Sequence, residues 1–353
     1  MEKQLQQLEN GLAKLQSKGS KFYFLTQDTE GNAMASVETN YRYAKYLVDA
    51  GYDANVLYEK AQYKGVESWL GTDYSELPHT NIESGELKVG PQDFVIIPEL
   101  YGNTLEQLMN MPCTKIVLSQ SHDYILDTLN PGFGWSNYNV TRCITTTEEQ
   151  KKYIASIFPS IQTDVISPVI PDYFVSSEKP KKPIISIHTR DQRMTMKIIK
   201  MFYLQNPQFK WLTFRDMRGM SKEEFAKVLG ESCLSVWVDR ISSFGTYPLE
   251  SMKCGTPVIG VLPTMKPEWL TKENGVWSQD ETTLVGSIST FMKNWLEDSL
   301  PEELYKSMET TPKQYTVEKE TKSVLTYFEG LVSEKVLELE ASINKLKPVE
   351  ENI

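Results

Sequence analysis

The stretch SSFGTYPLESMKCGTPVI, residues 242–259, is the most informative part of this chain. It follows an apolar run, Leu234–Val238, whose length and β-branched content predict a buried strand. A turn containing Gly245 comes next, and a helix is then expected to begin near Pro248 and to stop at Gly255. A second strand follows directly, so the stretch predicts a strand, a turn, a helix and a strand in close succession.

This order of elements is suited to holding an anion. The N-terminus of a helix presents free backbone N–H groups and a partial positive charge, and a glycine turn lets a ligand approach them. Glu250 is expected in the first turn of the helix, where its carboxylate can accept two hydrogen bonds from the hydroxyls of a sugar. The stretch therefore predicts a pocket for a nucleotide sugar.

Residues 244–259 resemble the signature of the family-4-like retaining glycosyltransferases of the GT-B fold, Glu-x-Phe-Gly-x-Pro-x-x-Glu-Ala-Met-Ala-x-Gly-x-Pro-Val. The chain departs from this pattern at Ser242, where the family has the first glutamate of its Glu-x7-Glu pair. The resemblance implies that Glu250 binds the ribose of the donor. It also implies that the donor sugar and phosphates lie over Ser242, Ser243, Phe244, Gly245 and Thr246.

Length and composition agree with a two-domain enzyme. A chain of 353 residues with 40% hydrophobic content can bury two cores of ordinary size. Its net charge of −10 argues against binding nucleic acid or an anionic membrane, so a phosphate-bearing substrate needs a local basic site. No apolar run is long enough to span a membrane, the N-terminus does not read as a secretory signal, and the cysteines are scattered. These features favour a cytoplasmic location.

The first half predicts an α/β domain over residues 1–170, with an added amphipathic helix over 4–17. Strands are expected at 21–26, 54–58, 93–97, 115–118, 144–147 and 164–166, with helices at 36–50 and 148–158. A Pro- and Lys-rich linker over 171–183 leads to a second α/β domain, 184–312, with strands at 184–188, 211–214 and 234–238. The GT-B resemblance implies two doubly wound, Rossmann-like domains facing each other across a cleft. It also implies that the C-terminal helix, 313–347, crosses back to the first domain.

Candidate residues of the first domain follow its predicted strands. In an open α/β sheet, the loops at the carboxyl ends of the strands form the ligand crevice. Gly31, Asn32, Glu99 and Tyr101 are therefore candidates for the acceptor side, the alternative being ordinary turn or loop structure. His122 follows another such strand and resembles the cleft histidine with which family members contact the donor sugar. A purely structural histidine is the alternative for His122.

The second domain supplies basic side chains. Arg190 and Lys197 follow the strand at 184–188, and by resemblance they grip the donor diphosphate, with Arg193 as a rival to Arg190. A solvated run of charge at the start of a helix is the alternative. Arg215, in the loop expected after the next strand, is a candidate for contact with the nucleobase.

Three functions fit these features. The first is a retaining transferase that uses a nucleotide-diphosphate sugar and needs neither a metal nor a further cofactor, with a carbohydrate, lipid-linked or protein acceptor. The second is a GT-B subunit that has lost catalysis and acts in binding or as a chaperone, as Ser242 suggests. The third is another enzyme of the same fold, such as an epimerase or an inverting transferase.

Overall fold

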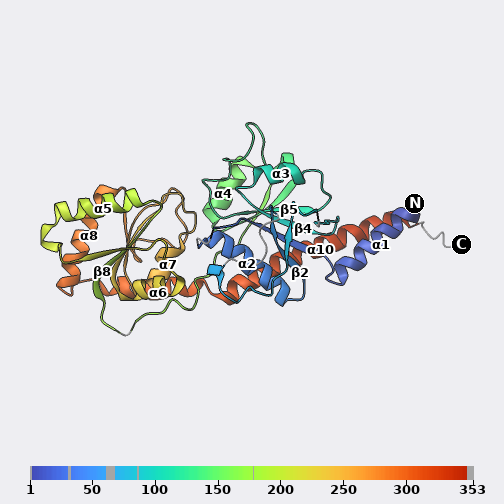
Figure 1. Ribbon diagram of the computed structural model, residues 1–353. Coiled ribbons are helices and arrows are strands. Elements are labelled where there is room, and N and C mark those ends of the chain that lie inside the picture. The colour runs from blue at the N-terminus through green and yellow to red at the C-terminus, as the bar shows by residue number, and fades with distance from the viewer. Residues whose placement is uncertain (1, 31–32, 61–67, 86, 178, 348–353) are drawn as a thin grey trace.

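Two parallel β-sheets, each flanked by helices, make up the chain (Figure 1). The computed structural model describes residues 2–30, 33–60, 68–85, 87–177 and 179–347. Both sheets are built from strands that alternate with helices along the chain, which is the doubly wound arrangement. The predicted fold class, α/β with two Rossmann-like domains, is confirmed.

The N-terminal domain contains a seven-stranded sheet in the order β3-β2-β1-β4-β5-β6-β7. Its strands are β1 Lys21–Thr26, β2 Asp53–Tyr58, β3 His79–Asn81, β4 Phe94–Pro98, β5 Thr114–Ser119, β6 Val140–Thr145 and β7 Gln162–Val165. The helices of this domain are α2 Ala35–Asp49, α3 Gly102–Leu108 and α4 Glu148–Ile157, with short 3₁₀ turns at Ser68–Leu70 and Trp135–Tyr138.

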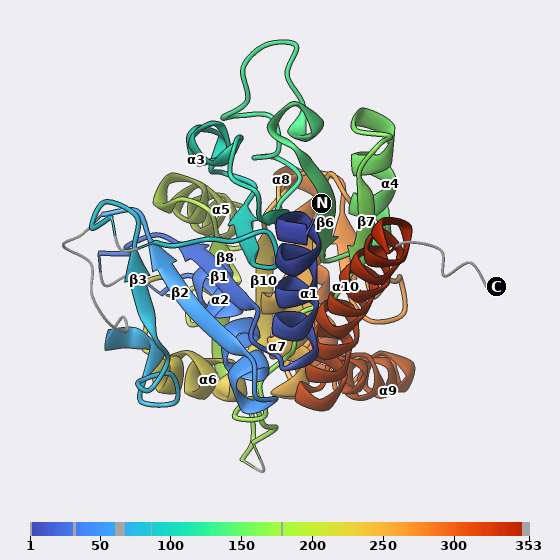
Figure 2. The same ribbon diagram turned by 90° about the vertical axis from the view of Figure 1, so that its right-hand side faces the viewer.

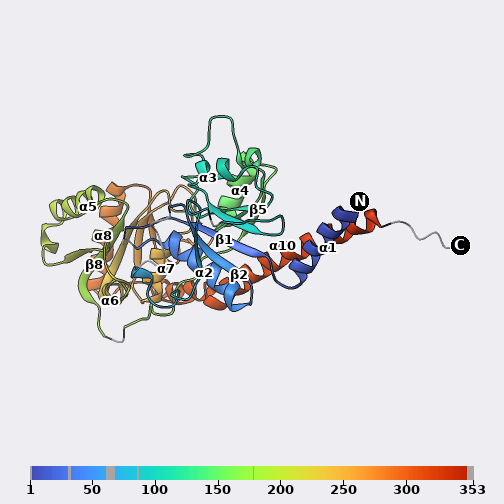
Figure 3. The same ribbon diagram turned by 45° about the vertical axis from the view of Figure 1, so that its right-hand side comes forward.

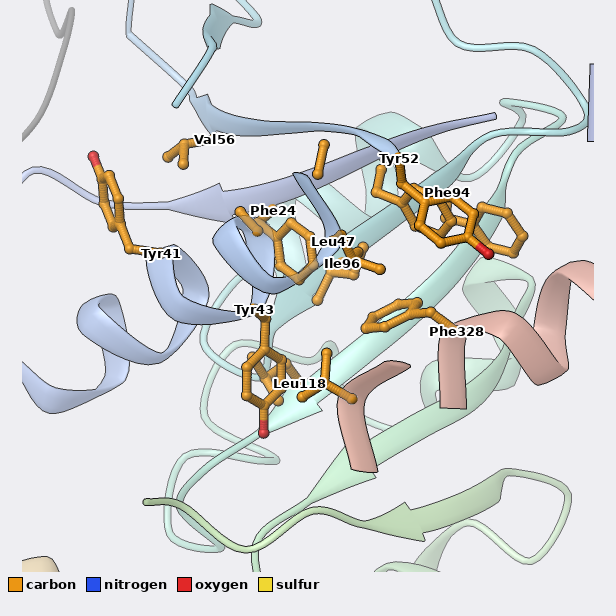
Figure 4. Close-up of a cluster of buried hydrophobic side chains, with 14 of the residues drawn as sticks. Phe24, Tyr41, Tyr43, Leu47, Tyr52, Val56, Phe94, Ile96, Leu118 and Phe328 are labelled. Carbon is orange, nitrogen blue, oxygen red and sulfur yellow. The ribbon is translucent and has the colours of Figure 1, made fainter. Parts of the chain in front are cut away.

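One face of this sheet is covered by α2 and by the C-terminal helix α10, Val317–Leu346 (Figure 4). Phe22 of β1 stacks on Phe94 of β4, with ring centroids 4.7 Å apart. Phe328 of α10 meets Phe22 edge to face at 5.5 Å. All three rings are fully buried, so a helix from the end of the chain completes the core of the first domain.

The C-terminal domain contains a five-stranded sheet in the order β12-β11-β10-β8-β9. Its strands are β8 Lys182–Thr189, β9 Thr213–Asp216, β10 Ser232–Val238, β11 Val258–Val261 and β12 Val276–Ser278. The helices are α5 Gln192–Gln205, α6 Lys222–Glu231, α7 Thr246–Lys253, α8 Glu281–Leu296 and α9 Glu302–Thr310, with 3₁₀ turns at Pro207–Phe209 and Pro312–Gln314.

The chain passes between the domains twice. After the second passage, α10 runs as one unbroken helix along the N-terminal domain and beyond it, where α1, Glu2–Gln16, lies beside it (Figures 1, 2 and 3). Near its start, the buried carboxylate of Glu320 receives Arg42 of α2 at 3.0 Å and the backbone N–H of Val169 at 3.1 Å. One side chain of α10 thus ties a helix of the first domain to the first passage.

Several elements differ from the sequence prediction. The strand expected at 144–147 lies at 140–145, because Thr147 leaves the sheet to cap α4 by accepting from the N–H of Gln150. The strand expected at 211–214 lies at 213–216, because a short helix at 207–209 occupies the chain before it. The prediction omitted β3, β12, α3 and α9, which are all short. No helix within the described ranges has both the length and the apolar character needed to cross a membrane.

Candidate active site

The turn after β10 depends on a glycine. Gly245 has a φ of 73°, in the left-handed region, and it is the residue that precedes the first turn of α7. A Cβ atom placed there would lie 2.8 Å from the ring of Trp237. Both the backbone conformation and the close approach of Trp237 require a residue without a side chain.

Helix α7 begins at Thr246, two residues before the predicted start at Pro248. Proline is tolerated at Pro248 because the first N–H groups of a helix have no intrahelical acceptor. This earlier start moves Glu250 from the first turn, where the sequence analysis placed it, into the second. Its carboxylate is therefore one turn further from the exposed N–H groups than predicted.

Glu250 is half-buried, and burial raises the pKa of its carboxyl group to about 7. A hydrogen bond with Thr246 opposes this shift, and the negative charge of Glu38 adds to it. Glu38 belongs to α2 of the N-terminal domain and pairs with Lys222 of α6 at 2.8 Å. The surroundings of Glu250 therefore come from both domains, and its charge changes near neutral pH.

Two side chains of the turn maintain its shape. The ring of Phe244 is buried and meets Tyr315 edge to face at 5.1 Å, while its carbonyl oxygen accepts from the indole N–H of Trp269 at 2.7 Å. The hydroxyl of Ser243 is buried and accepts from the backbone N–H of His122 at 2.9 Å. Ser242 is half-buried beside them. Only the backbone of residues 243–245 is left to face a ligand.

His122 lies in the loop after β5 and contacts the C-terminal domain directly. Its Nδ1 atom is 3.1 Å from the hydroxyl of Ser243, and the hydroxyl of the preceding Ser121 donates to the carbonyl of Ile241 at 3.0 Å. Burial lowers the pKa of the imidazole, so the ring is neutral at neutral pH. The histidine predicted for the cleft therefore abuts the motif turn.

Glu99 differs from the expectation of an acceptor-side contact. Its side chain is buried, and one carboxylate oxygen accepts from the backbone N–H groups of Gln120 at 3.0 Å and Ser121 at 2.7 Å. Burial raises its pKa to about 7, against the effect of these hydrogen bonds. Glu99 cannot reach a ligand from this position; it holds the loop that carries His122.

Of the two predicted diphosphate residues, Arg190 contacts both domains and Lys197 does not. The guanidinium of Arg190 donates to Asp239 at 2.8 Å and to the hydroxyl of Tyr124, in the N-terminal domain, at 3.2 Å. Lys197 is half-exposed on α5, and its Nζ atom is 3.9 Å from the carboxylate of Glu281. The rival Arg193 is exposed on the same helix.

Arg215 does not lie in a loop after a strand, as predicted, but within β9 itself. Its guanidinium faces Glu224 of α6 at 3.3 Å, and both side chains are about half-exposed. This arrangement is a surface ion pair. The other predicted residues of the loops divide further: Tyr101 lines a cavity of about 300 Å³ beside α3, whereas Gly31 and Asn32 lie outside the described residues.

The two domains also meet around a second cavity of about 560 Å³. One wall is the N-terminal turn of α4, with Glu148 and Lys152, and the other is the loop 266–273 of the C-terminal domain. Glu268 of that loop accepts from the backbone N–H of Glu148. Together with the contacts of His122, Arg190 and Lys222, this shows that the carboxyl ends of the two sheets face each other.

Sequence reasoning missed four residues that join the domains: Glu38, Lys222, Tyr124 and Asp239. Each is a common surface residue type with no motif of its own. Asp239 offered the clearest signal, because an acidic residue directly after a buried strand lies at the ligand edge of the sheet. The other three could be found only by knowing how the domains approach each other.

The chain is similar in sequence to a known glycosyltransferase. No family model matches the chain. An alpha-1,6-glucosyltransferase of Actinobacillus pleuropneumoniae is 26% identical over 250 residues, which cover 68% of this chain and 71% of that protein.

Solved structures are similar across nearly the whole chain. A sucrose-phosphate synthase of Thermosynechococcus elongatus superposes with a TM-score of 0.65 at 13% identity, covering 89% of this chain and all of the other. The pneumococcal O-GlcNAc transferase GtfA, in complex with UDP and GlcNAc, superposes with a TM-score of 0.64 at 9% identity, covering 90% and 99%. Two doubly wound domains that meet at the carboxyl ends of their sheets, together with these neighbours, give the chain the GT-B fold.

Proposed function

We propose that this protein is a glycosyltransferase that moves a sugar from a UDP-sugar to an acceptor. The observation that carries the proposal is the contact between the motif turn and the opposite domain, where His122 meets Ser243 and Arg190 meets Tyr124. Catalysis across two domains requires groups from both at one place, and here they converge on the N-terminus of α7. The similarity to a glucosyltransferase and to a transferase solved with UDP supports the choice of UDP, and glucose is the first sugar to test.

In this proposal each group has a separate role. The carboxylate of Glu250 accepts hydrogen bonds from the ribose hydroxyls, and the N–H groups at the start of α7 receive the diphosphate. Arg190 and Lys197 offset the charge that develops on the leaving diphosphate. The bond between the anomeric carbon and the diphosphate oxygen breaks, a bond to the acceptor oxygen forms, and the acceptor proton leaves on UDP. His122, neutral at neutral pH, orients the sugar.

Retention of configuration and independence from divalent metal are further parts of the proposal. Retention rests on the spacing of Phe244 and Glu250, which resembles that of the retaining family. Metal independence rests on the basic side chains and the helix N-terminus, which supply the electrostatic stabilisation that a metal would otherwise give. Loss of activity with a chelator and its return with Mg²⁺ or Mn²⁺ would contradict this part.

A second candidate, a non-catalytic GT-B subunit, is favoured by one observation: Ser242 replaces the glutamate that in the resembled family holds hydroxyls of the donor sugar. One experiment separates the candidates. UDP-glucose is incubated with the protein and simple glycosides, and ¹H NMR follows the release of UDP and the anomeric configuration of any product. Transfer with an α-linked product supports the proposal. UDP binding without transfer or hydrolysis of any UDP-sugar favours the non-catalytic subunit, and an epimerised UDP-sugar indicates an epimerase.

A further inference from the structure

The cavity beside α3 has the position of a second substrate site. It lies where the chain leaves β2, β3 and β4, on the ligand edge of the N-terminal sheet. Its volume of about 300 Å³ is at the lower end of the range for small-molecule pockets. The lining residues come from four segments that are distant in the sequence: Glu59, Ile82, Glu83, Leu100, Tyr101, Asn103, Thr104 and Gln107.

The lining combines the groups that recognise a sugar. Carboxylates of Glu59 and Glu83 can each accept two hydroxyl hydrogen bonds, while the amides of Asn103 and Gln107 both donate and accept. Tyr101 adds an aromatic ring for the apolar C–H face of a sugar ring. A pocket built only for an apolar ligand would not gather so many hydrogen-bonding groups.

Several of these groups are held in place before any ligand binds. The hydroxyl of Thr104 donates to the carboxylate of Glu59, and the backbone N–H of Glu83 donates to the carbonyl of Glu59 at 3.0 Å. Burial, and then the negative charge of Glu59, raise the pKa of Tyr101. Glu59 and Tyr101 therefore lie within electrostatic reach of each other, on opposite sides of α3's first residues, in a preorganised arrangement.

The charge of the lining restricts what can bind. Among the eight lining residues two are glutamates and none is lysine or arginine. A phosphate or carboxylate on the ligand would face these carboxylates without a compensating cation in the lining. We propose that this cavity is the acceptor subsite and that it takes an uncharged, hydroxyl-rich sugar unit. This inference rests on the proposed function, because it identifies the acceptor of that reaction.

The kinetic test compares a neutral and an anionic acceptor. Methyl β-glucoside should be a better acceptor than glucose 1-phosphate, which carries its charge on the same carbon. Glu59→Gln and Glu83→Gln should each raise the KM for methyl β-glucoside about tenfold, equivalent to about 1.4 kcal/mol, and should narrow the difference between the two acceptors. The Kd for UDP should not change. Glu106→Gln is the matched control, because Glu106 is exposed on α3 and outside the lining.

The same sugar unit could be free or part of a larger glycan, and two further acceptors separate these sources. Octyl β-glucoside and a glucosylated peptide carry the unit on different carriers, and the one with the higher kcat/KM identifies the natural context. Both results support the proposal, because the sugar unit is common to both. A peptide without the sugar that is accepted equally well would overturn it.

A binding measurement keeps the inference separate from the proposed function. Isoleucine residues are labelled with ¹³C at the δ1 methyl, and the signal of Ile82, in the cavity wall, is followed as methyl β-glucoside is added. A saturable shift that glucose 1-phosphate does not produce is expected, even in a protein that transfers no sugar. If the Ile82 signal does not move, or if correctly folded Glu59→Gln and Glu83→Gln variants keep the KM of the wild type, the cavity is not the acceptor subsite.

Discussion

The two halves of the candidate site are built in different ways. In the C-terminal domain the turn before α7 is shaped by nearby residues, with Gly245 in a left-handed conformation against the ring of Trp237. In the N-terminal domain the loop that carries His122 is held by Glu99, which comes from the end of the preceding strand and accepts two backbone N–H groups. One half depends on backbone conformation, the other on a buried carboxylate.

This difference predicts different responses to change. A turn that depends on steric fit fails when volume is added, and it is insensitive to pH. A loop held by a buried carboxyl group with a raised pKa changes with pH and with the chemistry of that one side chain. The following predictions test this contrast, beginning with the largest expected effect.

Replacing Gly245 should cause the largest loss of stability. In Gly245→Ala the new Cβ atom would meet the ring of Trp237 at 2.8 Å while the backbone keeps a φ of 73°. The left-handed conformation costs about 1–2 kcal/mol, and overpacking a further 1–3 kcal/mol. Urea unfolding should therefore show a decrease of about 2–5 kcal/mol.

The control for this variant is Gly286→Ala, also a glycine in the C-terminal domain. A Cβ atom at Gly286 meets no heavy atom within 4 Å, and the residue lies inside helix α8, where alanine is favoured. Its stability should be equal to or above that of the wild type. Equal stability of both variants would refute the role given to Gly245.

Glu99 should make stability depend on pH. Its pKa rises from 4.5 to about 7 on folding, so its contribution is full below pH 4.5 and is lost as the pH rises through 7. A tenfold change in proton affinity is equivalent to about 1.4 kcal/mol, so Glu99 accounts for a decrease of about 3 kcal/mol between pH 5 and 8. Urea unfolding of Glu99→Gln across this range should show a correspondingly shallower decrease than the wild type. A profile that matches the wild type would contradict the buried, protonatable carboxyl group.

Glu250 should control nucleotide affinity. Glu250→Gln keeps the size of the side chain but loses the charge-assisted hydrogen bonds to the ribose, worth about 1.5–3 kcal/mol. Calorimetry should show the Kd for UDP rising more than tenfold. Because burial raises the pKa of this carboxyl group to about 7, affinity in the wild type should increase as the pH rises through 7.

The diphosphate of UDP also titrates, so the glutamine variant serves as the reference for this pH dependence. The wild type should show a steeper rise in affinity than Glu250→Gln over the same range. An unchanged Kd in the variant, at any pH, would remove Glu250 from the donor site.

His122 should have the smallest of these effects, on the choice of sugar. One neutral hydrogen bond contributes about 0.5–1.5 kcal/mol, so His122→Ala should change the preference for UDP-glucose over UDP-galactose about two- to tenfold. The Kd for UDP should stay the same. Ser242→Glu, which restores the family residue, is the companion variant, and we expect it to shift the preference as well. Unchanged ratios of kcat/KM in both would show that neither residue reads the sugar.

The same contrast explains how far the sequence predicts the structure. The strand, the turn and the helix of residues 234–253 could be predicted because glycine and apolar periodicity act on neighbours in the chain. The start of α7 at Thr246 could not, because nothing in the residues marks the cap once Gly245 takes a left-handed conformation. Glu99 was predicted to face the acceptor, since the sequence does not reveal that two backbone N–H groups about twenty residues later turn toward it.

Contacts between the domains were the least predictable part. Lys222 and Glu38 are 184 positions apart in the chain, and their pairing beside Glu250 depends on how two complete domains approach each other. Residue types as common as lysine and glutamate carry no signal for such a pairing. The motif turn and the general edge of each sheet could be predicted from sequence, whereas the surroundings that raise the pKa of Glu250 required the structure.

The central claim, a nucleotide pocket formed at the motif turn, has one direct test. The melting temperature of the wild type is measured with UDP, GDP and ADP at about a hundred times a micromolar Kd, where binding stabilises a fold by about 2.7 kcal/mol. The account predicts that UDP raises the melting temperature by several degrees, more than GDP or ADP, and that Glu250→Gln loses most of this increase. No increase with any of the three nucleotides would contradict the account.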